Sequence, residues 1–425
     1  MNTQMARAAG LGIAVLGAQV ATNDAHAAAA NSVEQSTADY SAFIGLDDPL
    51  DAKGIAEANT SSSLDSSGCV NVAADTSGLF GWYSEPVAIP HAAFAATEAM
   101  GQEIATGGNT VALLSNFRVA IFEINAQNVV EFQTLTPGDA NGPSRQVAVA
   151  PDGLEVAVAD ATGYLTFYRR DAVSGWQAAV AAQAFAPIQG SQDSTGKALT
   201  YSSDGTQLFV EIFGLNRGVR IFERDVDGNW AASAKIVPGK FTSVTDRIMG
   251  WSANRLLVSD QDSILVYKRG ATNFEFVHAI SLSAVPSKLN VYGNNFSITT
   301  PGTVIFYRFN GTRFDRAFTR QTPLADIAVL NATNFPSGPL FAGADLGAAG
   351  VCGRLRFLFA NFPPNLGTFV LPERVPSIVS GPWGVIASTV SATGAGELYI
   401  VARDRIFGGQ NPPPGTFSPG QGSFE

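Results

Sequence analysis

Residues Gln146–Arg170 read QVAVAPDGLEVAVADATGYLTFYRR. Apolar residues alternate in the first part, and Pro151-Asp152-Gly153 then supplies the turn residues of a β-hairpin. A return strand follows at once, and a third apolar strand ends in two aromatic and two basic residues. We therefore predict four antiparallel strands: Gln146–Ala150, Leu154–Ala159, Tyr164–Arg170 and a fourth that begins at Trp176 and runs into Phe185.

The end of the third strand is a motif that the chain repeats, and we call it the aromatic–charge motif. Its clear copies are Phe167-Tyr168-Arg169-Arg170, Ile221-Phe222-Glu223-Arg224 and Val266-Tyr267-Lys268-Arg269, and its weaker copies are Ile121-Phe122-Glu123-Ile124 and Phe306-Tyr307-Arg308-Phe309. In most copies a polar turn leads to a second aromatic residue, which is Trp176, Trp230, Phe274 or Phe314. The copies recur at intervals of roughly 40–54 residues, and short strands at such a period indicate one sheet per repeat around an axis.

The repeats together predict an all-β fold, a β-propeller of seven four-stranded blades. The other repeats are Gln102–Leu135, Ala198–Ile236, Val244–Leu282, Ser287–Arg320, Asp326–Leu371 and Pro376–Arg403. The last repeat has only three convincing strands, and Gly81–Ile89 is an unpaired strand-like segment ahead of the first. Because an open ring would leave edge strands that invite aggregation, we predict that this N-terminal strand closes the ring.

The ends of the chain predict export and flexible flanks. Residues 1–27 have the pattern of a signal peptide: Arg7, an apolar run from Ala8 to Ala21, and Ala25-His26-Ala27 as a cleavage site. Residues 28–77 are rich in Ser, Ala and Asp and predict a partly disordered linker, the propeller spans 78–407, and 408–425 is a Pro/Gly-rich tail. We expect a periplasmic, cell-surface or extracellular protein.

The composition suits a β-protein with a large core and few charges. Hydrophobic residues make up 46% of the chain and charged residues 15%, and the net charge is −10. An acidic surface repels phosphate backbones, so the charge argues against nucleic acid as a partner. After the signal peptide, no stretch approaches the 18 apolar residues of a membrane span. We expect a monomer that binds a protein or carbohydrate ligand.

The chain has two cysteines, Cys69 and Cys352. In an exported chain an isolated pair is typical of a disulfide, and this bridge would close a very long loop. The alternative is two buried, unpaired thiols.

The repeats resemble those of known propeller families. Gln146–Arg170 resembles the repeats of secreted bacterial seven-bladed propellers of the lactonase-like and YVTN types. Ile221–Lys235, in which a turn and a tryptophan follow the motif, is similar to the FG-GAP-like repeats of the integrin-α kind. The resemblance implies the fold, and for the lactonase-like type it also implies a metal-assisted ring-opening site, but blade repeats specify packing rather than chemistry.

One segment has the composition of a calcium loop. Glu223, Asp225 and Asp227 alternate with other residues and Gly228 follows, so their oxygens could share one side of a tight turn. This run occurs once, between a third and a fourth strand, and Asp-Gly also suits a solvated hairpin turn, which we favour. Beyond this weak Ca²⁺ candidate, the sequence predicts no cofactor and no catalytic residue.

Two functions remain open at this point. The first is an exported, non-catalytic binding or scaffolding propeller that uses the loops and the channel mouth on one face. The second is a lactonase-like hydrolase or lyase that acts on a lactone or a carbohydrate. The side chains that the inner strands carry distinguish them, because an enzyme needs acidic or histidine groups from several blades close together.

Overall fold

The computed structural model places Ile55–Glu425 in one compact unit. It describes residues 62–64, 70–72, 87–89 and 100–402, except for 116, 126–127, 136–143, 161–164, 179–193, 214–216, 237–247, 271–272, 332–338, 346–352, 361–364, 372 and 391–396. The predicted signal peptide, most of the predicted linker and the predicted tail lie outside the described residues. None of the described segments is an apolar helix of membrane-spanning length.

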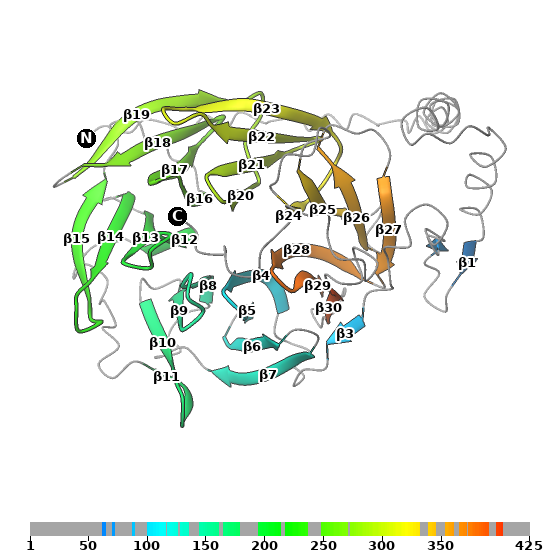
Figure 1. The fold of residues 1–425 in the computed structure, drawn as a ribbon, viewed down its shortest axis with the longest axis horizontal. Coiled ribbons are helices and arrows are strands. Elements are labelled where there is room, and N and C mark those ends of the chain that lie inside the picture. Colours follow the sequence, from blue (N-terminus) through cyan, green and yellow to red (C-terminus); the bar gives the residue numbers. More distant parts are fainter. Residues whose placement is uncertain are drawn as a thin grey trace, which may run out of the picture. The chain divides into compact units, whose positions relative to one another are not determined.

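Seven four-stranded antiparallel sheets follow one another around an axis, and we number them blades 1 to 7 (Figure 1). Blades 1 to 3 contain β4 (Met100–Gly107), β5 (Thr110–Ser115), β6 (Val119–Asn125), β7 (Asn128–Leu135), β8 (Ser144–Val149), β9 (Glu155–Asp160), β10 (Leu165–Asp171), β11 (Gly175–Ala178), β12 (Ser194–Tyr201), β13 (Gln207–Phe213), β14 (Gly218–Arg224) and β15 (Trp230–Ile236). Blades 4 to 6 contain β16 (Met249–Ser252), β17 (Arg255–Asp260), β18 (Ser263–Arg269), β19 (Phe274–Ser281), β20 (Lys288–Tyr292), β21 (Asn295–Thr300), β22 (Thr303–Phe309), β23 (Phe314–Gln321), β24 (Asp326–Asn331), β25 (Leu340–Asp345), β26 (Gly353–Phe359) and β27 (Asn365–Leu371). The predicted seven-bladed propeller is confirmed.

Blade 7 closes the ring with a strand from the N-terminal side of the domain. It consists of β28 (Arg374–Gly381), β29 (Gly384–Val390), β30 (Leu398–Ala402) and β3 (Val87–Ile89). The short β3 pairs antiparallel with β30, so that Val87 lies opposite Ile400 and Ile89 opposite Leu398. The predicted closure is confirmed, although the strand occupies only the last residues of the predicted Gly81–Ile89 segment.

Two further strands lie within the segment that we expected to be a linker. β1 (Ser62–Leu64) and β2 (Val70–Val72) form a two-stranded antiparallel sheet. β2 lies against β27, the outer strand of blade 6. This small sheet is an element that the sequence did not predict.

The aromatic–charge motif ends the third strand of blades 1 to 5, as predicted. A β-bulge recurs opposite this motif. The fourth strand of the blade has one extra residue at the point where it pairs with the first two residues of the motif. A β-bulge of this kind bends the strand and increases its twist. The bulges lie opposite Ile121/Phe122, Ile221/Phe222, Val266/Tyr267 and Phe306/Tyr307, and blade 6 has one opposite Phe357/Leu358.

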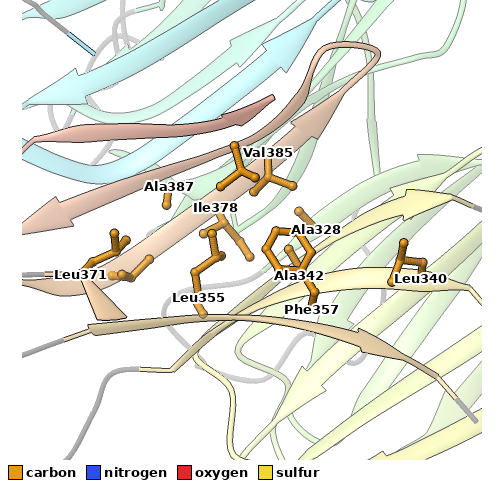
Figure 2. Packing of buried hydrophobic residues seen from close by; sticks show 12 residues of the cluster. Ala328, Leu340, Ala342, Leu355, Phe357, Leu371, Ile378, Val385 and Ala387 are labelled. Carbon is orange, nitrogen blue, oxygen red and sulfur yellow. The ribbon is translucent and has the colours of Figure 1, made fainter. Parts of the chain in front are cut away.

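The hydrophobic core lies between neighbouring blades. Figure 2 shows one such layer, in which side chains of blade 6 such as Phe357 and Leu355 pack against Ile378 and Val385 of blade 7. Aromatic stacking makes the same connection elsewhere: the rings of Phe167 in blade 2 and Trp230 in blade 3 stack with their centroids 5.4 Å apart. The motif aromatics therefore hold blades together.

The order of the strands gives the ring two different faces. Each blade starts at its innermost strand, so β4, β8, β12, β16, β20, β24 and β28 all begin on one face. We call this the connection face, because the chain also passes there from one blade to the next. The turns after the first and third strands lie on the other face, which we call the hairpin face.

Candidate functional site

Three charged side chains from different inner strands meet on the connection face. The ammonium nitrogen of Lys288 (β20) lies 3.8 Å from Glu103 Oε2 (β4) and 3.9 Å from Asp326 Oδ2 (β24). The side chains of Lys288 and Glu103 are 27% exposed, whereas that of Asp326 is 4% exposed. These strands belong to blades 5, 1 and 6. The cluster therefore joins three blades near the ends at which their inner strands begin. We call it the axial triad.

Asp326 fixes the position of the axial triad through hydrogen bonds to three blades. Its Oδ2 accepts hydrogen bonds from the Ser377 hydroxyl at 3.0 Å and from the Ile378 N–H at 3.1 Å, both on β28 of blade 7. Its Oδ1 accepts the Ile327 N–H at 2.8 Å and the Asn290 amide of blade 5 at 3.5 Å. A buried carboxylate with this many donors is held in one orientation. These hydrogen bonds therefore hold the Asp326 carboxylate, and with it one member of the triad, in a fixed position.

The two carboxylates of the triad keep Lys288 protonated near neutral pH. Burial alone would lower the pKa of the Lys288 ammonium, but the charges of Asp326 and Glu103 outweigh it, so the pKa is raised above 10.5. A protonated amine has no lone pair, so Lys288 cannot act as a nucleophile or a base near neutral pH. It can donate hydrogen bonds to a ligand, and Glu103 can accept them.

A second buried carboxylate, Glu155 of β9, lies on the hairpin side between blades 2 and 3. Its side chain is 1% exposed and accepts hydrogen bonds from Arg169 Nε at 2.6 Å, Trp230 Nε1 at 2.8 Å and the Tyr201 hydroxyl at 3.1 Å. Arg224 lies 3.7 Å away. Arg169 also donates to the carbonyl of Gly228. Trp230, Tyr201 and Arg224 belong to blade 3, so the contacts of Glu155 join the two blades, and we assign this residue a structural role.

The structure does not bring the three calcium candidates together around one point. Glu223 accepts a 2.8 Å hydrogen bond from Gln207 and lies 3.8 Å from Arg269. Asp225 accepts the backbone N–H groups of Asp227 and Asn229 at 3.0 and 2.7 Å, and these bonds lower the pKa of its carboxyl. Within the described residues, no group of three or more His, Cys, Asp or Glu side chains is placed to share a metal ion.

The turn that contains Asp225 recurs in other blades with the same chemistry. Asp171 Oδ1 accepts the N–H groups of Val173 and Ser174, and Asn310 Oδ1 accepts those of Thr312 and Arg313. An Asp or Asn side chain that accepts hydrogen bonds from the backbone of its own turn in this way forms an Asx-turn, which is common in protein turns. The solvated hairpin turn that we favoured for Asp225–Gly228 agrees with this recurrence.

The predicted disulfide cannot be located directly, because Cys69 and Cys352 lie outside the described residues. Their following strands are described: β2 begins one residue after Cys69, and β26 begins one residue after Cys352. Both strands lie against β27.

Sequence reasoning missed the axial triad because its members belong to different repeats. One signal was present: Lys288 and Asp326 each begin an inner strand, and Glu103 lies in the first half of another. A charged residue at the start of a first strand in several repeats predicts charges that converge near the axis. The distance between any two of them depends on how the blades are placed.

Comparisons with known proteins show the fold and no family. No family model matches the chain, and no curated protein matches it in sequence. Among solved structures, the chain is similar to the β-propeller domain of Cps50 (Swd1) from Myceliophteria thermophila, with a TM-score of 0.53 and 10% identity. The match covers 74% of this chain and 98% of that domain. At this identity the likeness establishes a seven-bladed β-propeller and says nothing of its ligand.

Proposed function

We propose that this protein is an exported, non-catalytic binding or scaffolding propeller that holds a protein or carbohydrate partner on its connection face. The observation that supports the proposal is the axial triad: Lys288 and Glu103 are partly exposed, charged and anchored through Asp326. The exposed parts of Lys288 and Glu103 can contact polar groups of a partner while Asp326 stays hydrogen-bonded to blade 7.

Site-specific photo-crosslinking tests where the partner binds. A photoreactive residue at Val285, which is 56% exposed in the connection between β19 and β20, reports on the connection face. The matched control is Val173, which is 96% exposed in the β10–β11 turn on the hairpin face. We expect the full-length chain, produced in its native host, to give a crosslinked product from Val285 that Lys288→Gln weakens. Crosslinking from Val173 alone would contradict the proposal.

A turnover assay tests the non-catalytic part of the proposal. The purified protein is incubated with a panel of lactones and oligosaccharides, with and without added divalent cations. We expect no hydrolysis above that of the Asp326→Asn variant. Turnover that depends on Asp326 would show that the triad is catalytic and would overturn this part.

A further inference from the structure

A second polar site lies between blades 4 and 5, away from the axial triad. Arg255 begins β17, and His278 lies on β19 of the same blade. Both residues pair with β18, which lies between β17 and β19. Arg255 is opposite Lys268, and His278 is opposite Val266, which precedes Lys268 by two residues. Side chains that pair across strands share a face of the sheet, as do residues two apart. Arg255 and His278 therefore lie on one face of blade 4, and the apolar residues of that face pack against blade 5.

Arg255 spans the two blades but has unused hydrogen-bonding capacity. It donates to the carbonyls of Ala253 at 2.8 Å and of Thr312, in blade 5, at 3.1 Å, and its guanidinium lies 4.3 Å from the centre of the Phe309 ring. Its Nε is buried without a hydrogen-bond partner, and no carboxylate among the described residues forms an ion pair with it. The Arg255 side chain as a whole is partly exposed, so the buried Nε–H is the group that an acceptor from a ligand would satisfy.

His278 has an unused ring nitrogen on the same face. Its Nε2 is buried without a partner. Burial, followed by the positive charges of Arg255 and Arg313, lowers the pKa of the imidazole below 6.5. Burial and the basic side chains around His278 therefore disfavour a positive charge on its imidazole, and an anion bound beside it would favour one.

The surrounding charges keep the site positive although the whole chain carries −10. Blade 4 contributes Lys268 and Glu275, which pair with each other across strands on the same face. Blade 5 contributes Arg316, which is opposite Tyr307 on the facing sheet, and Arg313, which is 69% exposed and pairs with Asp315 at 2.8 Å. With Arg255 included, the seam contains four basic side chains and two acidic ones, Glu275 and Asp315.

We propose that Arg255 and His278 bind an oxyanion, a phosphate or sulfate group, in the seam between blades 4 and 5. The oxyanion accepts hydrogen bonds from Arg255 Nε and from protonated His278 Nε2, which are the two unused nitrogens, and Arg313 lies at the exposed rim. A tetrahedral oxyanion matches the fork of a guanidinium, and its negative charge balances the basic side chains around the site, as a neutral ligand would not. The site is independent of the partner proposed for the connection face.

Histidine NMR titration tests this site. The chain has only three histidines, His26, His91 and His278, so the His278 signal is assigned by its loss in His278→Gln. The probes are inorganic phosphate, inorganic sulfate and a sulfated disaccharide, each compared with chloride at equal ionic strength. We expect an oxyanion to move the titration midpoint of His278 upward by about 1 pH unit. A response to the disaccharide alone identifies a group on a larger ligand, and a response to the inorganic ions identifies a free oxyanion.

The matched variants are Arg255→Gln and Arg269→Gln. Arg269 is on the opposite face of blade 4, where it forms an exposed pair with Glu223, so its removal takes one positive charge from the same blade but not from the site. We expect the midpoint shift to vanish in Arg255→Gln and to persist in Arg269→Gln, and phosphate to raise the melting temperature of the wild type but not of His278→Gln. Equal midpoint shifts in chloride and phosphate, or an unchanged shift in Arg255→Gln, overturn the proposal.

Discussion

The indole N–H of Trp230 donates a 2.8 Å hydrogen bond to the buried carboxylate of Glu155. Trp230 begins the outer strand of blade 3, and Glu155 begins the second strand of blade 2. The same indole stacks on Phe167 of blade 2. One side chain therefore joins two blades by both stacking and a charged hydrogen bond, and Glu155 is the acceptor on which this junction depends.

Removing the Glu155 carboxylate should strongly destabilise the fold. Glu155→Ala leaves Trp230, Tyr201 and Arg169 without their shared acceptor in a buried position. We expect a loss of about 3 kcal/mol in the free energy of unfolding, measured by urea denaturation. The control is Glu123→Ala, whose ion pair with Arg170 is partly exposed and should cost less than about 1 kcal/mol. Equal losses in both variants would contradict the assigned role.

The axial triad should contribute stability that disappears at high pH. The folded pKa of Lys288 is raised above 10.5, so the folded state holds this proton more tightly than the unfolded state. The contribution is complete below pH 10.5 and is lost as the pH rises through the folded pKa. We expect Lys288→Met to be less stable than the wild type by about 2 kcal/mol at neutral pH.

The measurement is the difference in unfolding free energy between the wild type and Lys288→Met as a function of pH. Tyrosines and the other lysines titrate in both proteins and cancel in the difference. The difference should stay constant up to the usual lysine pKa of 10.5 and then shrink. A difference that grows with pH would be incompatible with a raised pKa.

Gly107 marks a place where two blades approach too closely for a side chain. A Cβ on Gly107 would overlap the carbonyl oxygen of Ala150 in blade 2 and lie 2.9 Å from its carbon. Gly107→Ala should therefore cost about 3 kcal/mol of stability, because backbone cannot move as a side chain can. Gly302→Ala is the control: it has a positive φ but open space around it, and should cost about 1 kcal/mol. Thermal midpoints that fall in the reverse order would refute the clash.

We expect Cys69 and Cys352 to form a disulfide. The strands that directly follow them, β2 and β26, both lie against β27, which places their neighbourhoods in the same part of the domain. Peptide mapping without reduction should recover one linked peptide pair. Quantitative alkylation of both cysteines in the unreduced, denatured protein would show that the bridge is absent.

The sequence was sufficient to predict the blades because packing in a propeller repeats locally. Phe167, Ile221 and Val266 occupy equivalent positions since each blade packs on its neighbour in the same way. The turns were equally predictable, because Asp152-Gly153 and Asp204-Gly205 require residues that tolerate positive φ, and both glycines adopt it. The closing strand β3 followed from the incomplete last repeat.

The candidate site could not be predicted in the same way. Lys288 meets Glu103 only because the ring closes and brings blades 5 and 1 to the same axis. Arg255 and His278 belong to the same repeat, but their common face depends on a bulge that shifts the register of β19 by one residue. The contact between Lys288 and Glu103 depends on how distant blades are placed around the ring, whereas the repeated motifs reflect only packing within a blade and between neighbouring blades.

The pairing of β3 with β30 sets the order in which the domain can be completed. β3 is synthesised before every blade, yet its partner is the last strand of the propeller. A growing chain, or one shortened before residue 398, therefore lacks the strand with which β3 pairs. Because the strand that precedes all seven blades pairs with the last strand of the propeller, the ring can close only when the whole propeller sequence is present.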